Sequence, residues 1–213
     1  MVRFFQSTAT DPPTMIYVGR DKEENEDLIK HGWDEDVWFH VDKLSSAHVY
    51  LRMSPGMTWD NLPEALLNDC AQLVKANSIE GNKKDNISII YTPWSNLKKT
   101  GAMDVGQVSY HNPKLVRYVK VAKRCNITVN RLNKTERIEF PDLRAQKEEH
   151  LNKLAFEKRE HQRQLDNQSR EQQRLAREEK ERNSYDRLFE NTGSMLSNKE
   201  ASMLGIDLEE DFM

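Results

Sequence analysis

The sequence predicts an α+β protein: one domain with an antiparallel sheet and flanking helices, followed by a long charged helix and a disordered acidic tail. Apolar residues cluster before about residue 140 of the 213, so a single core is expected there. Several short segments of that region alternate apolar and polar residues with period two, as half-buried strands do. Beyond Pro141 acidic and basic residues intermingle with almost no glycine or proline, which favours a solvated helix. We therefore expect a domain over 1–140, a helix over 141–190 and a tail over 191–213.

The expected elements follow the chain in order. Period-two alternation and turn residues at the ends predict these strands: Val2–Ser7, Thr14–Val18, Asp36–Val41, Ala47–Met53 and Ile87–Tyr91. Capping residues and helical spacing predict two helices, namely Asp21–His31, ended by Gly32, and a second that opens at Asp60, Pro63 and Glu64. A hairpin is expected between Gln107–Tyr110 and Leu115–Val121, around the turn residues 111–114.

The charged segment Asp142–Arg182 is expected to form one long helix. It holds eleven basic and ten acidic residues. Acid-first pairs at i, i+4 support a helix, and they are Glu149–Lys153, Asp166–Arg170 and Glu178–Arg182. The prominent leucines do not keep a heptad spacing, and they are Leu151, Leu154, Leu165 and Leu175. A solvated single helix is therefore preferred to a weak coiled coil.

The composition argues against cofactor, metal and membrane-spanning proteins. Hydrophobic residues are 37% of the chain, charged residues 31%, and the mean hydropathy is -0.86. Cys70 and Cys125 lack Cys-x-x-Cys or Cys/His spacing, so neither a disulfide framework nor a zinc site is indicated. The uncharged stretch 86–97 is too short for the roughly 20 residues of a spanning helix. We expect a cytoplasmic protein without cofactor, with a nuclear location and peripheral membrane association left open.

The strands Asp36–Val41 and Ala47–Met53 are close enough in sequence to form a hairpin. Pairing Val41 with Ala47 across the loop gives one apolar face and one mixed face, because side chains alternate along a strand. The apolar pairs are Phe39–Val49 and Val37–Leu51. The pairs on the mixed face are His40–His48, Trp38–Tyr50 and Asp36–Arg52.

The mixed face combines imidazoles, aromatic rings and a charge pair, which suits phosphate contact and base stacking. The alternative is an ordinary polar ladder beneath a helix. A metal site at His40 and His48 is not favoured, because no third ligand lies in local register. Neighbouring serines lack the strand–turn–helix setting of a nucleophile, so no catalytic residue is expected.

Charge is distributed unevenly along the chain, although its formal total is -3. Residues 21–69 carry twelve acidic against four basic side chains, whereas residues 83–137 carry twelve basic against three acidic ones. One basic face could therefore bind a polyanion. The candidate phosphate contacts are Lys98, Lys99, Lys114, Arg117, Lys120, Lys123 and Arg124. Trp94, in a turn before the two adjacent lysines, is a candidate for stacking.

Several motifs resemble a known family. Four of them are similar to the NFACT-R domain: Asp36–Val41, Ser46–Leu51, Lys98–Lys99 and Asp104–Val108. The segment Glu24–Trp33 narrows the resemblance to the coiled-coil domain-containing protein 25 family, over about residues 1–140, and it extends to the charged helix and the acidic tail.

The resemblance implies an NFACT-R fold and an RNA-binding role, in a domain that larger proteins of ribosome quality control combine with others. A second role is ascribed within the family: a cell-surface sensor of extracellular DNA, acting through a short charged segment. That segment falls here on residues 20–24, which adds Arg20 and Lys22 to the candidate contacts.

We conclude from the sequence that a non-enzymatic nucleic-acid-binding module is the leading hypothesis. Its expected partners are RNA or DNA, with the ribosome or tRNA as candidates. Two alternatives remain at this stage. One is a protein-interaction adaptor that recruits partners through residues 142–213, and the other is the membrane-associated DNA sensor.

Overall fold

The computed structural model describes residues 1–183. The expected tail and the last residues of the expected helix lie outside the described residues. Residues Met1–Leu151 form one compact unit, and the rest of the long helix belongs to a second. The strands of the first unit are β1 (Val2–Ser7), β2 (Thr14–Gly19), β3 (Asp36–Val41), β4 (Val49–Arg52), β5 (Ile87–Pro93), β6 (Leu97–Lys98), β7 (Ser109–Tyr110), β8 (Arg117–Val121) and β9 (Arg137–Glu139). The α-helices are α1 (Lys22–His31), α2 (Glu64–Asn77), α3 (Asn126–Asn133) and α4 (Leu143–Arg182).

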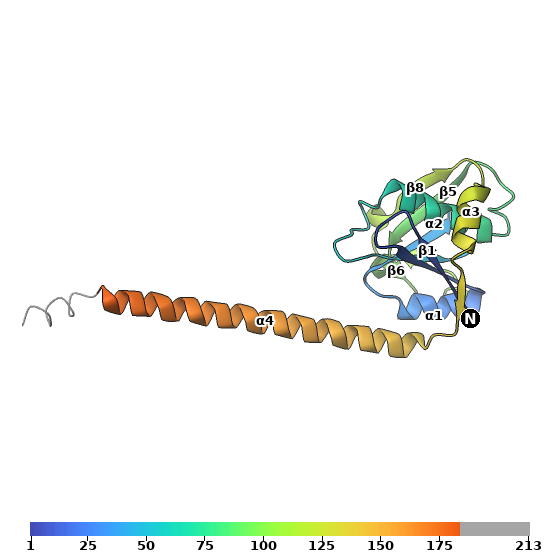
Figure 1. Ribbon diagram of the computed structural model, residues 1–213. Coiled ribbons are helices and arrows are strands. Elements are labelled where there is room, and N and C mark those ends of the chain that lie inside the picture. The colour runs from blue at the N-terminus through green and yellow to red at the C-terminus, as the bar shows by residue number, and fades with distance from the viewer. Residues whose placement is uncertain (184–213) are drawn as a thin grey trace, which may run out of the picture. The chain divides into compact units, whose positions relative to one another are not determined.

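The centre of the first unit is a seven-stranded antiparallel sheet, in the order β8-β5-β3-β4-β2-β1-β9 (Figure 1). β6 and β7 form a separate two-stranded sheet. The α+β class is confirmed, and so are the five strands and two helices expected up to residue 91. Three short elements, α3, β6 and β9, were not anticipated.

The expected hairpin between residues 107–110 and 115–121 is wrong. β7 pairs with β6 instead, and β8 pairs with β5 at the end of the main sheet. A 3-10 turn at Pro113–Leu115, capped by the side chain of Asn112, lies between β7 and β8. Alternation identified both strands correctly, but it does not say which neighbour a strand pairs with.

Both faces of the main sheet are covered. On one face the core contains Phe5, Phe39 and Leu51, and α2 packs over it with α3 beside it. On the other face a second core forms around Trp38 and Tyr50. α1 lies over this face, together with the β6–β7 sheet and Leu143 at the start of α4.

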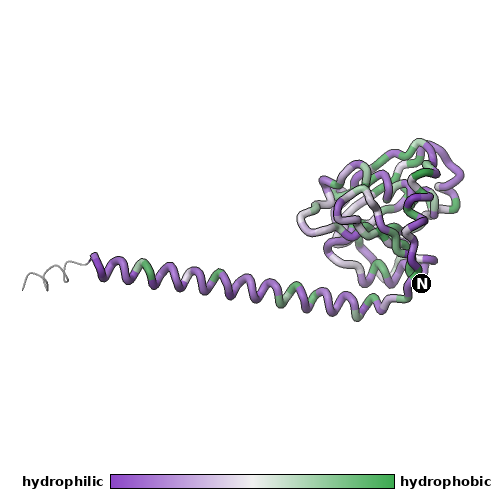
Figure 2. The backbone as a smooth tube through the Cα atoms, in the orientation of Figure 1, coloured by the Kyte–Doolittle hydropathy of each residue, from purple (hydrophilic) through white to green (hydrophobic). Residues whose placement is uncertain are grey.

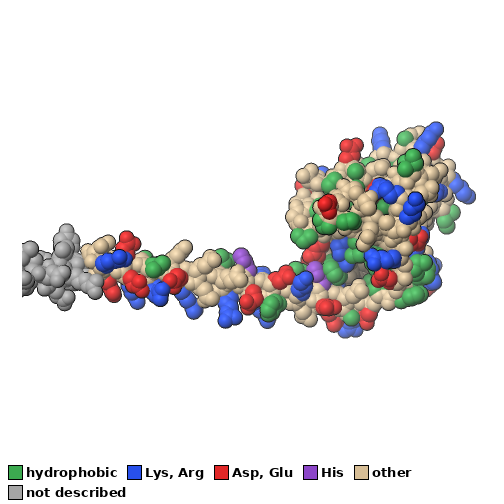
Figure 3. Space-filling view, viewed as in Figure 1, with side chains coloured by type: hydrophobic (Ala, Val, Ile, Leu, Met, Phe, Trp, Pro, Cys, Tyr) green, Lys and Arg blue, Asp and Glu red, His purple; other side chains and the backbone are tan. Residues whose placement is uncertain are grey.

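The long helix α4 runs without a break through 40 residues, as expected. Figure 2 shows a mostly hydrophilic chain with isolated hydrophobic positions, and Figure 3 shows acidic and basic side chains interspersed along it. The ion pairs formed along α4 are not the three expected ones. They include Arg144–Glu148, Arg163–Glu160 and Arg174–Glu171. Among residues 1–183, no helix has both the length and the apolar character needed to cross a bilayer.

A buried carboxylate joins three parts of the first unit. Asp36 on β3 is fully buried and accepts hydrogen bonds from the Arg52 guanidinium at 2.9 and 3.0 Å. It also accepts from the Tyr17 hydroxyl at 2.7 Å and from the backbone N–H of Trp33 at 2.8 Å. Burial, followed by the charge of Asp36, raises the pKa of Tyr17, so this hydroxyl stays protonated and donates. The four hydrogen bonds compensate for removing the carboxylate from water.

The first residues of α4 are attached to this cluster. The Arg52 guanidinium lies 3.4 Å from the centre of the Trp33 ring, and Trp33 stacks on His150 with 3.8 Å between ring centres. His150 Nε2 lies 3.1 Å from both carboxylate oxygens of Glu35. The Lys147 ammonium lies 4.3 Å from the centre of the Trp94 ring.

Replacing Asp36 with alanine should therefore cost about 3–5 kcal/mol of unfolding free energy, because it leaves the Arg52 charge without its buried partner. Glu80→Ala is the matched control, since Glu80 forms an exposed ion pair with Lys84, and it should cost at most about 1 kcal/mol. Urea denaturation followed by tryptophan fluorescence measures both. Equal losses in the two variants would contradict the central place given to Asp36.

Candidate nucleic-acid interface

The hairpin register follows the sequence prediction. Asp36 pairs with Arg52, Val37 with Leu51, Trp38 with Tyr50, and Phe39 with Val49. β4 begins at Val49, so His48 precedes the strand, yet the rings of His40 and His48 lie 4.9 Å apart, edge to face. The apolar face belongs to the core beneath α2, as expected.

The mixed face is not the open surface that the sequence suggested. Trp38 is 1% exposed and Tyr50 0%, because α1 and the β6–β7 sheet cover them. The side chain of Arg52 is engaged with Asp36 and Trp33. Stacking of a base on Trp38 or Tyr50 is therefore excluded in this conformation, and the alternative, a face buried beneath a helix, describes them better.

Both histidines are held in the neutral form. Trp38 Nε1–H donates to His48 Nδ1 at 2.9 Å, which places the His48 proton on Nε2. His40 Nδ1 lies 2.7 Å from the carbonyl of Val41, so it carries the proton, and Nε2 of His40 remains an acceptor. Burial, and next the neighbouring His40, lowers the pKa of His48 to about 3. Burial also lowers the pKa of His40.

The candidate lysines and arginines divide into engaged and accessible groups. Lys99 is engaged, because its ammonium contacts Glu26 Oε1 at 2.5 Å and the carbonyls of Asp104 and Gln107 at 2.7 and 2.9 Å. It holds the 99–107 loop against α1 and is unsuited to phosphate contact. Two of the others are exposed but hydrogen-bonded, because Arg117 donates to the carbonyl of Asp60 at 2.6 Å and Arg124 to Asn82 Oδ1 at 2.8 Å. The remaining four are exposed lysines: Lys98, Lys114, Lys120 and Lys123.

The remaining candidates are also placed by their contacts. Trp94 is half-buried, its Nε1–H donates to the carbonyl of Ile29 at 2.7 Å, and Lys147 lies against its ring. That arrangement leaves little of the ring for stacking. Arg20 is exposed and paired with its neighbour Asp21 at 2.8 Å, and Lys22 is exposed.

Five of the exposed cations lie on or beside β8, the strand at one end of the main sheet. We call this surface the β8 edge, and its exposed residues are Lys114, Arg117, Tyr118, Lys120, Lys123 and Arg124. Val119 and Val121 face the core beneath α2, so Tyr118 and Lys120 point to the opposite face. Tyr118 is 62% exposed and was missed in the sequence, although the alternation of β8 could have revealed it. Cations beside an exposed aromatic ring are the elements of a single-strand nucleic-acid site.

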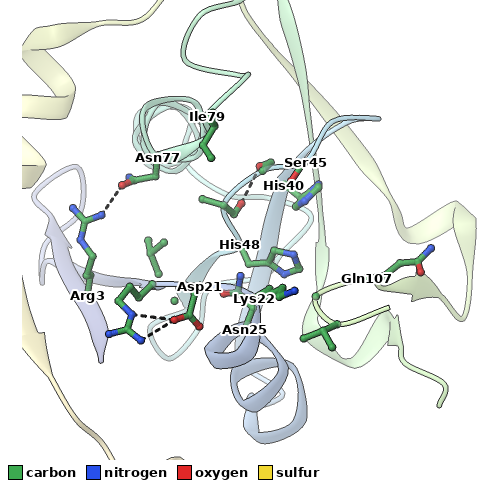
Figure 4. A pocket seen from close by; sticks show the side chains of 17 residues that line it. Arg3, Asp21, Lys22, Asn25, His40, Ser45, His48, Asn77, Ile79 and Gln107 are labelled. Carbon is green, nitrogen blue, oxygen red and sulfur yellow. Dashed lines mark hydrogen bonds and ion pairs between the residues drawn. The ribbon is translucent and has the colours of Figure 1, made fainter. Parts of the chain in front are cut away.

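A pocket of about 530 Å³ lies where β3 ends and where β4 and α1 begin, and it collects four other candidates, namely Arg20, Lys22, His40 and His48. Figure 4 shows three of them on different elements: His40 at the end of β3, His48 just before β4 and Lys22 at the start of α1. The 106–107 loop closes another side. In residues 1–183, no cluster of three or more His, Cys, Asp or Glu side chains suits a metal ion.

Comparison with known proteins identifies the family. The sequence profile described as "NFACT protein RNA binding domain" matches residues 1–112. The coiled-coil domain-containing protein 25 of Danio rerio is 61% identical over 148 residues, which cover 70% of this chain and 72% of that protein. The chain belongs to the coiled-coil domain-containing protein 25 family. As a member of that family it carries an RNA-binding domain of the NFACT type.

Two more distant proteins place the family in a wider context. The Rqc2 homolog RqcH of Streptococcus pneumoniae serotype 2 is 28% identical over 122 residues, which are 56% of this chain but only 21% of RqcH. The C-terminal part of the fibronectin/fibrinogen-binding protein from Streptococcus suis superposes with a TM-score of 0.51 at 18% identity, over 61% of this chain and 48% of that one. This second likeness shows a shared fold.

The low pKa of His48 predicts that the protein loses stability in mild acid. Below pH 6.5 the unfolded chain binds a proton at His48, whereas the folded chain does so only near pH 3, so stability falls as the pH falls between these values. By pH 5 this one group should cost about 2 kcal/mol.

The measurement is thermal unfolding between pH 7.5 and 5, compared with His48→Gln, whose side-chain oxygen can still accept from Trp38. The variant should lose less stability than the wild type over this range. Parallel curves would show that His48 is not held neutral.

Proposed function

We propose that this NFACT-type domain binds single-stranded regions of RNA along the β8 edge. The observation that carries the proposal is the exposed Tyr118, with the exposed Lys120 on the same face of β8. An exposed ring stacks on a base regardless of its identity, while the neighbouring cations contact phosphates. The family's RNA-binding description supports RNA as the ligand.

The electrostatics favour this surface over other parts of the chain. Many of the acidic residues in 21–69 are neutralised within the fold: Glu26 by Lys99, Asp36 by Arg52 and Asp69 by Arg131. Three lysines of the β8 edge, by contrast, form no ion pair among the described residues, namely Lys114, Lys120 and Lys123. Their field is therefore available to an anionic partner.

We further propose that the domain acts by binding, without catalysis, and that its RNA belongs to the ribosome or to tRNA. The similarity to an Rqc2 homolog, over the matched 122 residues, supports a connection with ribosome quality control. The DNA-sensor alternative receives less support, because the charges of Arg20 and Asp21 compensate each other.

The salt dependence of binding tests the β8 edge. Lys120→Ala combined with Lys123→Ala should lower affinity for a fluorescein-labelled single-stranded RNA. The same double variant should reduce the slope of log K against log salt by about 1.4, because each lost phosphate contact on a single strand contributes about 0.7. Tyr118→Ala should weaken binding by roughly 5- to 150-fold with the slope unchanged, as expected for the loss of one stacked base. Fluorescence anisotropy of the full chain at several salt concentrations gives both quantities.

Lys134→Ala with Arg137→Ala is the matched control, since it removes two exposed cations beside and on β9, at the opposite end of the sheet. This pair should leave the slope nearly unchanged. Equal effects of the two double variants would reject the β8 edge as the binding surface. The sensor would be favoured instead if a duplex DNA of similar length bound more tightly than the RNA and if Arg20→Ala abolished that DNA binding.

A further inference from the structure

The 530 Å³ pocket has the size of a small-molecule site, for which about 300–1,000 Å³ is usual. Its floor and its rim differ in chemistry. The groups on the floor are uncharged, and they include Asn25, His40 and His48. The rim is mixed in charge, because Arg3 is paired with Glu136 and Arg20 with Asp21, and Lys22 is the lining cation outside these ion pairs (Figure 4).

Asn25 is the group in this pocket that the fold leaves unsatisfied. Its side chain is 7% exposed, and its Oδ1 atom has no hydrogen-bond partner among the described residues. Any side chain at Gly19 would collide with Asn25 Oδ1, so the glycine provides the space that the amide occupies. A buried polar atom without a partner costs about 1–3 kcal/mol, which a structural role alone does not repay. The oxygen itself has almost no accessible surface, so a ligand in the pocket that Asn25 lines satisfies it only after the amide turns.

Two further side chains offer hydrogen bonds to the same space. His40 lines the pocket. Its Nδ1–H donates to the carbonyl of Val41, which leaves Nε2 as an acceptor. Gln107 also lines the pocket, and its Oε1 accepts from the backbone N–H of Asp104, which leaves its NH₂ group as a donor. Neutral donors and acceptors beside apolar walls match the edge of a nucleobase, which carries groups of both kinds.

The sheet register connects the pocket to the β8 edge. His40 pairs with Ile90, and Ile90 pairs with Tyr118, so all three side chains lie on one face of the sheet. Two strand spacings, about 10 Å, separate His40 from Tyr118. An RNA strand that stacks on Tyr118 can therefore reach the pocket with an adjacent part of its backbone.

We propose that this pocket binds one unpaired nucleotide, with the base against Asn25, His40 and Gln107 and the phosphate beside Lys22. The inference rests on the proposed RNA binding and adds to it a site that takes a single base out of the strand. The β8 edge supplies general affinity, and the pocket supplies selectivity among bases.

Titration of the full chain with nucleoside monophosphates tests the pocket directly. AMP, CMP, GMP and UMP are added separately while the ¹H–¹⁵N NMR signals of the Asn25 and Gln107 side-chain amides are followed. At least one of the four should shift these signals saturably, and inorganic phosphate at the same concentration should shift them much less. The same base placed in a single-stranded oligonucleotide should bind more tightly than the free nucleotide, because the β8 edge then contributes.

Asn25→Ala is the decisive variant. The Asn25 side chain makes no hydrogen bond in the structure and alanine is the better helix former, so the variant should fold with an unchanged or higher melting temperature. Its affinity for the preferred nucleotide should fall about tenfold, the usual effect of one lost hydrogen bond. Asn130→Ala is the matched control at an exposed site on α3 and should bind as the wild type does. His40→Phe, which keeps a ring beside Trp38, provides a second variant.

The outcomes separate this inference from the proposed function. If RNA binds with the predicted salt dependence but no nucleotide shifts the amide signals, the pocket assignment is wrong and the β8 edge stands. If phosphate alone reproduces the shifts, the site is an anion site and base recognition is rejected. Unchanged nucleotide affinity in both Asn25→Ala and His40→Phe also overturns the inference. If nucleotides bind the pocket but RNA does not bind the β8 edge, the proposed function fails and the pocket remains as a nucleotide site.

Discussion

The buried carboxylate of Asp36 is the constraint on which the rest of this domain depends. A charge with no exposed surface is stable only if donors surround it, and here Arg52, Tyr17 and the backbone of Trp33 provide them. These partners come from β4, from β2 and from the loop after α1, so one carboxylate fixes three elements against β3. The stack of Arg52, Trp33 and His150 extends the same cluster to the start of α4.

Covering both faces of the sheet decides where a ligand can bind. The second core removes Trp38 and Tyr50 from solvent, and the contact of Trp38 with His48 keeps that histidine neutral. Two places near the edges of the sheet remain accessible: the pocket at His40 and the exposed ring of Tyr118. Half of the twelve acidic residues in 21–69 are paired with a cationic group or a histidine within the fold. A chain with a negative total can therefore present a positive edge to RNA.

Several features of the fold could be predicted from local pattern. Alternation with period two determined the strands and the register of Trp38 with Tyr50, because shifting by one residue would have placed Phe39 in the wrong core. Asp21 marked the start of α1 for a similarly local reason, because its side chain caps the helix within the first turn. Gly32 marked its end, as a residue that stops helices. The motifs resembling NFACT-R were sufficient to indicate the family.

Sequence by itself thus determined the strands, their faces and the charge of each region, all of which depend on neighbours along the chain. Only the tertiary structure decided which face is open, since a period of two separates two faces but does not show that α1 lies over one of them. It also decided that Lys99 is held in an ion pair with Glu26, which is 73 residues away in the sequence and so gives no local signal. Asn25 and Tyr118 became candidates for the same reason: whether a polar or aromatic side chain is satisfied depends on contacts between segments that are distant in sequence.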